Sequence, residues 1–410
     1  MRRLVMAAGA LLASTCGSMA EAPGDALGAR MCAGISGSVG ELGGSGFVLS
    51  YRPAEDEREL PPPLSTSAFT YDNALALIAA LACDDLEGAR KIGEAFRSVI
   101  ASDRRFSDGR VRNAYRAARV VPGEAALLPG WWDSGSEAWA EDAYQVGTAT
   151  GNVAWAALAL LNLHQATGEA WALQDAERLA GWIGTMSGGS GPPGYRGGVH
   201  GHDAEQSVLP WKSTEHHADI AAMAHWLHRI TGKPVYADMY RTARSFLDAM
   251  FDEEAGVFRM GTEPDGKLAP ASRIAMDAQV WPLIAVPEPA QQWKTALDNI
   301  EQHLAVTGGY DFNDDRDGLW TEGSAQAALV QRVLGRGSKA AEVLGGLSSL
   351  VGPNGWMRAT NVARLTTGLA IGPDSTSNDF FYFPRPHLGA TAWAVLAERG
   401  WNPFNGQRVE

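Results

Sequence analysis

The sequence predicts an all-α fold: an (α/α)6 barrel, or six-hairpin toroid, with short β-hairpin excursions in its loops. Two observations indicate it. Six helical segments between residues 70 and 396 are apolar on almost every face after a polar start, and five amphipathic, charged segments alternate with them. A helix that is apolar all round must be buried all round, whereas a helix with one apolar stripe has one face in water. We therefore expect an inner ring of the first kind and an outer ring of the second.

The apolar runs cover residues 74–82, 153–163, 220–227, 280–286, 327–334 and 388–396. The fourth run contains Pro282, which is unfavourable in a helix interior. The amphipathic segments cover residues 86–100, 170–186, 235–251, 289–304 and 338–350. An open α-solenoid is the alternative, but it needs a more uniform repeat length and polar caps, which we do not find.

The first 20 residues have the features of a signal peptide. Arg2 and Arg3 precede an apolar run over residues 4–13, and Ser18-Met19-Ala20 is a small-x-small cleavage site. A lipid anchor at Cys16 is less favoured, because the residues before it fit a lipoprotein signal poorly. We expect a secreted or periplasmic protein with no membrane-spanning segment.

Residues 21–64 are rich in Gly and Pro and predict an extended lead-in before a barrel domain over residues 65–410. No sixth outer helix follows residue 404, so the lead-in could take its place. Cys32 and Cys83 could form a disulfide in an oxidising compartment, or Cys83 could be a small buried residue. Residues 106–110 and 258–267 are typical of small hairpins.

Composition limits the partners. The formal net charge is −13 and no basic run occurs, so nucleic acid is not expected as a partner. The sequence contains no phosphate-binding or dinucleotide-binding glycine motif and no Gly-x-Ser-x-Gly. We expect a monomer without a cofactor.

The candidate site residues lie where the inner helices begin. In a ring these helix starts meet at one mouth, and carboxylates beside aromatic rings are what glycoside hydrolysis requires. The catalytic candidates are Asp72, Glu215 and Glu322, although a helix cap would explain each of them as well. The substrate-binding candidates are Trp132, Tyr195, Arg196, Trp211, His216, Asp219, Asp277, Trp281, Trp320, Gln326 and His387.

An acidic turn invites a metal interpretation. Asn313, Asp315 and Asp317 alternate before Gly318, as in a calcium loop, but Arg316 stands where a loop counted from Asp311 needs glycine. An acidic surface turn is the default interpretation, so we expect no metal.

Four motifs resemble the six-hairpin glycosidase-like superfamily over roughly residues 65–405: Thr70-Tyr71-Asp72-Asn73-Ala74-Leu75, Ser213-Thr214-Glu215-His216, Trp320-Thr321-Glu322-Gly323-Ser324-Ala325-Gln326 and His387-Leu388-Gly389-Ala390-Thr391-Ala392-Trp393. No individual family is identified. The resemblance implies a carbohydrate substrate bound at the inner-helix starts. Epimerases and polysaccharide lyases share the fold, so it does not define the reaction.

We expect a glycoside hydrolase acting on a poly- or oligosaccharide, with Glu322 as acid and Glu215 or Asp72 as base or nucleophile. One alternative is a polysaccharide lyase. It would take its base from His216, His217 or Tyr195, and Arg196 would neutralise a uronate. A non-catalytic glycan-binding protein of exopolysaccharide export is the other alternative.

Overall fold

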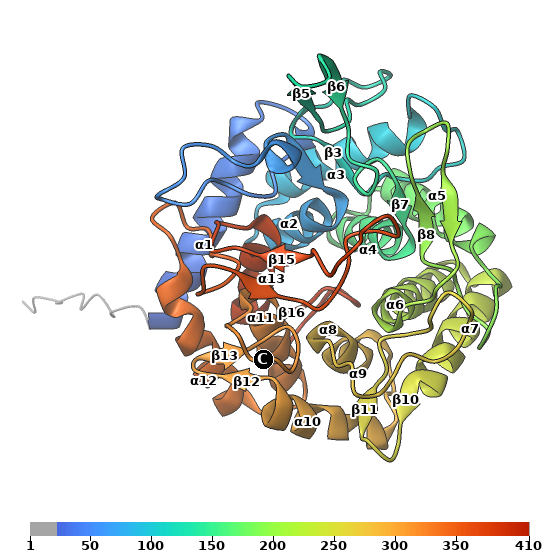
Figure 1. Ribbon diagram of the computed structural model, residues 1–410, viewed down its shortest axis with the longest axis vertical. Coiled ribbons are helices and arrows are strands. Elements are labelled where there is room, and N and C mark those ends of the chain that lie inside the picture. Colours follow the sequence, from blue (N-terminus) through green and yellow to red (C-terminus); the bar gives the residue numbers. More distant parts are fainter. Residues whose placement is uncertain (1–22, 410) are drawn as a thin grey trace, which may run out of the picture.

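The inner helices form a closed ring. The computed structural model describes residues 23–409, so the predicted signal peptide lies outside the described residues. The ring consists of α2 (Thr70–Ala82), α4 (Thr150–Thr167), α6 (Thr214–Thr231), α8 (Met276–Val280) with α9 (Pro282–Ala285), α11 (Thr321–Val333) and α13 (Leu388–Arg399). Each member packs against the next, and α13 packs against α2 (Figure 1). This closure excludes an open solenoid and confirms the predicted barrel.

The outer ring surrounds the inner one (Figure 1). It contains α3 (Leu86–Ala101), α5 (Ala170–Thr185), α7 (Pro234–Met250), α10 (Thr295–His303) and α12 (Gly337–Leu347). These are the predicted amphipathic segments, each with one buried stripe. Pro282 interrupts the fourth inner helix, as expected, so that α8 and α9 are separate short helices. Short 3-10 turns cover Pro62–Leu64, Gln291–Lys294 and Ser348–Leu350.

The sixth outer helix is α1 (Pro23–Glu41), which packs against α13. The prediction that residues 21–64 are extended is therefore wrong for this part of the segment. Met31, Ile35 and Val39 recur every four residues and are at most 1% exposed, so they form an apolar stripe. The glycines of this part of the segment lie in a helix and not in a loop. Gly34 allows α1 to approach a neighbouring segment closely, because a Cβ at this position would lie 2.7 Å from the Asn354 carbonyl oxygen.

A disulfide between Cys32 and Cys83 joins α1 to the end of α2, with the two Cα atoms 5.7 Å apart. The pairing decides between the two interpretations of these cysteines. It fixes the sixth outer helix to the first inner helix across 51 residues of chain.

Short antiparallel strands occupy the loops, as predicted. A three-stranded sheet contains β7 (Thr148–Ala149), β8 (Gly198–His200) and β9 (Ser207–Leu209). The predicted hairpin at residues 106–110 contains a bend and no strand. Residues 258–267 pair mainly with other segments, Phe258 with Phe251 and Gly261 with Ser213, and the local pairing is one bridge between Thr262 and Leu268. The remaining pairs are β1 (Gly46–Phe47) with β4 (Ala118–Arg119), β2 (Ser67–Phe69) with β3 (Ala114–Arg116), β5 (Trp131–Asp133) with β6 (Ala138–Ala140), β10 (Phe251–Asp252) with β11 (Val257–Phe258), β12 (Ala305–Val306) with β13 (Gly309–Tyr310), β14 (Leu365–Thr366) with β15 (Phe381–Tyr382), and β16 (Trp401–Asn402) with β17 (Gln407–Arg408).

The C-terminal segment closes the end of the barrel opposite the inner-helix starts. The Asn162 amide donates to the Pro403 carbonyl, and the Trp401 indole N–H donates to the Asn162 oxygen at 3.0 Å. The Phe404 ring lies 5.1 Å from the Trp155 ring, inside the inner ring. In the part of the chain that the structure describes, residues 401–404 therefore fill the end of the barrel opposite the inner-helix starts.

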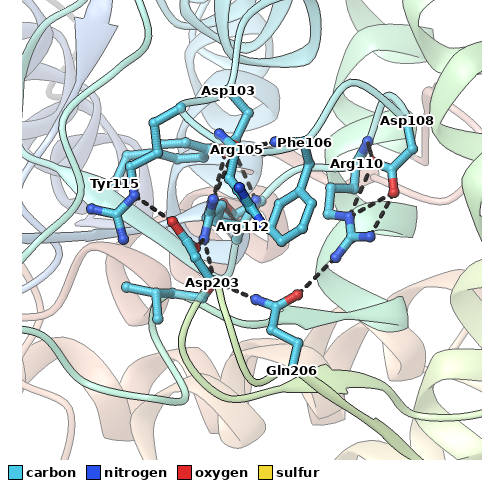
Figure 2. A network of polar contacts seen from close by, with 12 residues as sticks. Asp103, Arg105, Phe106, Asp108, Arg110, Arg112, Tyr115, Asp203 and Gln206 are labelled. Atoms are coloured by element: carbon cyan, nitrogen blue, oxygen red, sulfur yellow. Dashed lines mark hydrogen bonds and ion pairs between the residues drawn. The ribbon is translucent and has the colours of Figure 1, made fainter.

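A buried arginine anchors the loops at that mouth. Figure 2 shows Arg112 between Asp103 and Asp203. The Arg112 side chain is fully buried and donates two 2.7 Å hydrogen bonds to Asp103, as well as bonds to Asp203 and the Val146 carbonyl. The network joins the end of α3 to the loop after β8. It therefore holds the scaffold of the mouth and leaves the centre of the ring free of this charge.

Among the residues that the structure describes, no helix is long and apolar enough to cross a bilayer.

Candidate active site

The inner helices begin in the same way. In α2, α4, α6 and α11 the first residue is a threonine whose hydroxyl donates to an arginine carbonyl in a neighbouring loop. The pairs are Thr70 with Arg112, Thr150 with Arg196, Thr214 with Arg259, and Thr321 with Arg358. This shared start fixes the rotation of each helix. The residue that follows the first one, called the second position here, therefore occupies an equivalent place in each repeat.

The fourth position of the inner helices is structural. In each of five helices its polar side chain bonds the backbone of a neighbouring loop or strand. The pairs are Asn73 with Val48, His217 with Tyr195, Gln279 with Phe258, Ser324 with Tyr310, and Thr391 with Met357. These side chains hydrogen-bond the backbone of the protein itself and are therefore not available to a substrate.

The second position faces the inside of the ring. It carries Tyr71 on α2, Glu215 on α6, Asp277 on α8 and Glu322 on α11. The Tyr71 hydroxyl reaches Glu322 although α13 stands between their helices in the ring, so both side chains lie within the mouth. Three successive members of the ring thus each contribute one carboxylate to a shared centre.

The sixth position lies one helical turn deeper and forms a floor. Trp155, Trp281 and Trp393 contact one another there, with ring centroids 5.3 to 5.9 Å apart. Asp219 and Gln326 occupy the same position on α6 and α11. Trp281 is only 4% exposed, so it lies in this floor below the carboxylates. The floor is largely aromatic and buried, so the centre above it is poorly solvated.

Glu322 is held by one oxygen and free at the other. Its Oε1 accepts a 2.6 Å hydrogen bond from the Tyr71 hydroxyl and a longer one from Gln326. Its Oε2 is buried without a hydrogen-bond partner, 3.7 Å from Nδ1 of His387. Burial, together with the charges of Asp72 and Asp277, raises the pKa of Glu322 to about 7. Near neutral pH this carboxyl can therefore hold or release a proton.

His387 lies between Asp72 and Glu322. Its Nε2 is 3.3 Å from Asp72 Oδ2, and the ring stacks on Tyr51 with centroids 4.3 Å apart. Burial opposes the imidazolium, but the neighbouring Asp72 charge and hydrogen bond raise the pKa of His387 above its usual value. Gly389 makes room for this pair, because a Cβ there would lie 2.6 Å from Asp72 Oδ1.

Glu215 and Asp277 form a proton-sharing pair. Burial raises the pKa of Glu215 well above its usual value, and the Asp277 charge and a hydrogen bond between the two carboxyls raise it further. Burial also raises the pKa of Asp277. The Glu215 side chain keeps 36% of its surface accessible, so water moderates the shift without reversing it. Two close carboxyls favour a state with one proton and one negative charge.

His216 and Asp219 flank this pair. Nε2 of His216 lies 3.5 Å from Glu215, and burial lowers the pKa of His216 to about 4, so the imidazole is neutral. Burial and the Asp277 charge raise the pKa of Asp219 well above its usual value. The Trp211 ring packs 5.6 Å from His216, at the edge of the cluster.

The remaining sequence-predicted residues lie outside the carboxylate centre. Trp320 is 2% exposed and packs on Phe312 and Tyr382. The Tyr195 hydroxyl bonds Thr242 of the outer helix α7, and the Arg196 guanidinium donates to carbonyls at the end of α5. Trp132 is 62% exposed on β5, at the outer edge of the molecule in Figure 1.

Sequence reasoning did not select Tyr71, Trp155 or Trp393 for the site. Aligning the helix starts on their first residue would have found them. Tyr71 then shares the second position with the carboxylates, and the two tryptophans share the sixth position with Asp219.

The acidic turn brings different residues together from those expected. Ligand atoms of Asp311, Asp315 and Asp317 lie within 4.8 Å of one another, whereas the Asn313 amide bonds the Thr366 carbonyl. Both oxygens of Asp311 accept backbone N–H bonds, and the other two carboxylates bond Thr366. The fold itself explains this cluster.

Solvent access is uneven across the centre. Asp72 and Glu322 side chains are each 4% exposed, whereas Glu215 is 36% exposed. A ligand therefore meets Glu215 first. Two cavities of the described residues lie elsewhere: one beside α1, lined by Ser38 and Phe47, and one around Pro353.

Solved structures with this fold include carbohydrate-active enzymes. No family model and no curated protein matches the sequence. A glycosidase in complex with glucose has a TM-score of 0.60 at 12% identity, over 91% of this chain and 98% of its own. A GH76 α-mannanase of Bacteroides thetaiotaomicron has 0.59 at 12%, over 92% and 96%. A sugar epimerase from a ruminal bacterium has 0.62 at 13%, over 92% and 99%.

At such low identity the likeness shows the fold alone. The chain has the six-hairpin glycosidase-like fold that its motifs resemble, over more than nine-tenths of its length. Because an epimerase shares it, the reaction must be argued from the residues of the centre.

Proposed function

We propose that the protein is a glycoside hydrolase that uses the paired carboxylates of its inner-helix starts. The observation that carries the proposal is the free oxygen of Glu322, on a carboxyl whose pKa is about 7, beside the proton-sharing pair of Glu215 and Asp277. Glycoside cleavage needs one carboxyl that gives a proton to the leaving oxygen and another that activates water or attacks the sugar.

Glu322 serves as the general acid in this proposal. Its Oε2 is free to donate, and Tyr71 holds the other oxygen in place. The single negative charge that Glu215 and Asp277 share serves as base or nucleophile, on the side that solvent reaches. The carboxylate of Asp72, whose Oδ2 lies 3.3 Å from His387 Nε2, supplies negative charge near the acid, which favours positive charge that develops on the sugar ring.

Of the residues that a lyase could use, His217, Tyr195 and Arg196 are engaged by the fold, which leaves His216 as its candidate base. Both ring nitrogens of His217 are occupied by the backbone at Tyr195 and Ser213. Tyr195 and Arg196 bond the outer helices α7 and α5, so neither is free to remove a proton or to bind a uronate.

The test is a panel of neutral and anionic glycans with chromatographic detection of products. Wild type should release saturated sugars from a neutral glycan, while Glu322→Gln and Glu215→Gln should each be at least about 10²-fold slower with the fold intact. Glu177→Gln is a matched control, because Glu177 also accepts a tyrosine hydroxyl, that of Tyr236, but on the outer ring. Unsaturated, ultraviolet-absorbing products would support a lyase, and binding without products a glycan-binding protein.

We also propose export to an oxidising compartment. The disulfide between Cys32 and Cys83 supports it, because such bonds persist outside the reducing cytosol. Mass spectrometry of the exported protein should find a mature N-terminus after Ala20, and an intact protein carrying Arg2 and Arg3 would contradict cleavage.

A further inference from the structure

Two exposed tryptophans stand side by side on a hairpin at the edge of the barrel. Trp132 on β5 and Trp139 on β6 are paired directly across the strands, which puts both side chains on one face of the hairpin. Trp132 is 62% exposed and Trp139 is 45% exposed. The hairpin projects from the ring beyond the outer helices (Figure 1). The carboxylate centre does not account for this apolar face.

The pair is held in a fixed orientation. A Cβ at Gly130 would lie 2.6 Å from Nε1 of Trp139, so this indole rests on the Gly130 backbone. The Arg116 guanidinium lies 4.6 Å from the centroid of the Trp139 ring. Within the turn, Asp133 accepts bonds from the Gly135 N–H and the Ser136 hydroxyl. Rigid aromatic surfaces bind with little entropic cost, which favours a ligand site over a surface that must first be ordered.

Few residues separate the hairpin from a residue that adjoins the carboxylate centre. Trp139 is followed five residues later by Tyr144, so their Cα atoms are at most about 18 Å apart. Burial raises the pKa of Tyr144 to about 12; a hydrogen bond with Asn152 opposes the rise, and the charges of Glu215 and Asp72 add to it. Tyr144 therefore adjoins the centre. A chain-like ligand can therefore span both places.

Charge limits the occupant. The hairpin carries Asp133 and Glu137, while Arg116 is engaged with the Trp139 ring. Carboxylates beside the indoles repel a polyuronate or a sulfated glycan, and apolar sugar faces stack on indoles.

We propose that Trp132 and Trp139 form a stacking platform that binds a neutral polysaccharide outside the carboxylate centre. The inference rests on the proposed function in taking a glycan as ligand. It adds a second binding place, a preference for polymer over short sugar, and a charge class for that polymer.

The experiment measures the binding of polymers and, separately, the cleavage of a disaccharide. Affinity electrophoresis in gels with neutral polysaccharides, and with polygalacturonate as the anionic probe, measures binding without turnover. One neutral polysaccharide that slows the migration of wild type is chosen for the comparison. The Trp132→Ala/Trp139→Ala variant should bind this polymer at least about 10-fold more weakly than wild type, and should cleave a disaccharide of the same sugar at the wild-type rate. Trp132→Phe should keep most of the binding.

Leu127→Ala is the matched control, because Leu127 is also 62% exposed and its carbonyl accepts the Arg116 N–H. It should bind polymer like wild type. Equal polymer binding by the double variant and wild type overturns the platform, as does a wild-type dimer that the double variant abolishes. If wild type binds polymer through the pair but cleaves nothing, the result supports the platform and contradicts the proposed hydrolase activity. If wild type cleaves the disaccharide but no polymer slows the migration of the protein in the gel, the result supports the hydrolase activity and contradicts the platform.

Discussion

The Tyr71 hydroxyl donates a 2.6 Å hydrogen bond to Oε1 of Glu322, across the helix that separates them in the ring. The same hydroxyl accepts a 2.7 Å bond from the Trp393 indole on that intervening helix. Three inner helices are thus joined at one atom. The bond leaves Oε2 of Glu322 as the only oxygen of this carboxyl free for proton transfer, which gives Tyr71 a positioning role.

Tyr71→Phe should slow cleavage about 10-fold and shift the alkaline limb of the pH profile upward, because the Tyr71 bond acts to lower the pKa of Glu322. Tyr236→Phe is the matched control: its hydroxyl also donates to a glutamate, Glu177, but on the outer ring. A lower rate with an unmoved pH profile would assign Tyr71 to packing alone.

The rate should fall as pH rises through about 7, where Glu322 loses its proton. Stability should also fall with rising pH, because a carboxyl whose folded-state pKa is raised above 4.5 binds more protons folded than unfolded. Glu322→Gln should therefore raise the melting temperature more at pH 8 than at pH 5. Equal shifts at both pH values, measured by calorimetry, would show that Glu322 is not the titrating group.

Gly389→Ala should disturb the site more than the fold. The added Cβ would lie 2.6 Å from Asp72 Oδ1 and 3.1 Å from the His387 ring, so the two side chains or the helix must shift. We expect a loss of about 1–3 kcal/mol in stability and at least a 10-fold loss in rate. Gly181→Ala on α5 is the control, since a Cβ there meets nothing within 4 Å. It should be neutral or slightly stabilising.

Replacing both Cys32 and Cys83 by serine should lower the free energy of unfolding by about 2–5 kcal/mol, because the bond restricts the unfolded chain. Urea titrations of wild type with and without dithiothreitol should show the same difference, and the double variant should not respond to reductant. A wild-type midpoint that ignores the reductant would mean that the bond does not stabilise the fold.

The Arg112 network should make the mouth sensitive to acid. Burial acts against the charged forms, but hydrogen bonds from Arg112 hold the pKa values of Asp103 and Asp203 below their usual 3.8. Their stabilising contribution is complete above that value and is lost as pH falls through the lower folded-state values. Arg112→Met should cost about 3–5 kcal/mol at pH 7, and the cost should decrease as pH falls below 3.8, to pH 3 and beyond. Calorimetry at both pH values measures the difference.

Much of the fold could be predicted because the burial of a helix determines how apolar residues are distributed along its own sequence. The alternation of residues 74–82 with residues 86–100, apolar all round and then striped, already separates an inner from an outer helix. The same reasoning missed α1, because Gly28, Gly34, Gly37 and Gly40 weaken its helical signal. At Gly34 the reason for glycine is a close contact with Asn354, 320 positions away, which the local sequence does not show.

The sequence by itself determined that polar residues gather at the starts of apolar helices, and a ring then requires them to meet. Only the tertiary structure decided which of them face inward. Glu215 and His217 differ by two residues, about 200° around the helix, so one enters the centre and the other bonds a neighbouring backbone. The helix rotation that makes this choice comes from hydrogen bonds between repeats, such as Thr214 to Arg259, which join residues 45 positions apart. The local sequence around one partner does not indicate the other partner. The same holds for Tyr71 and Glu322, which are 251 positions apart and meet only because the ring closes.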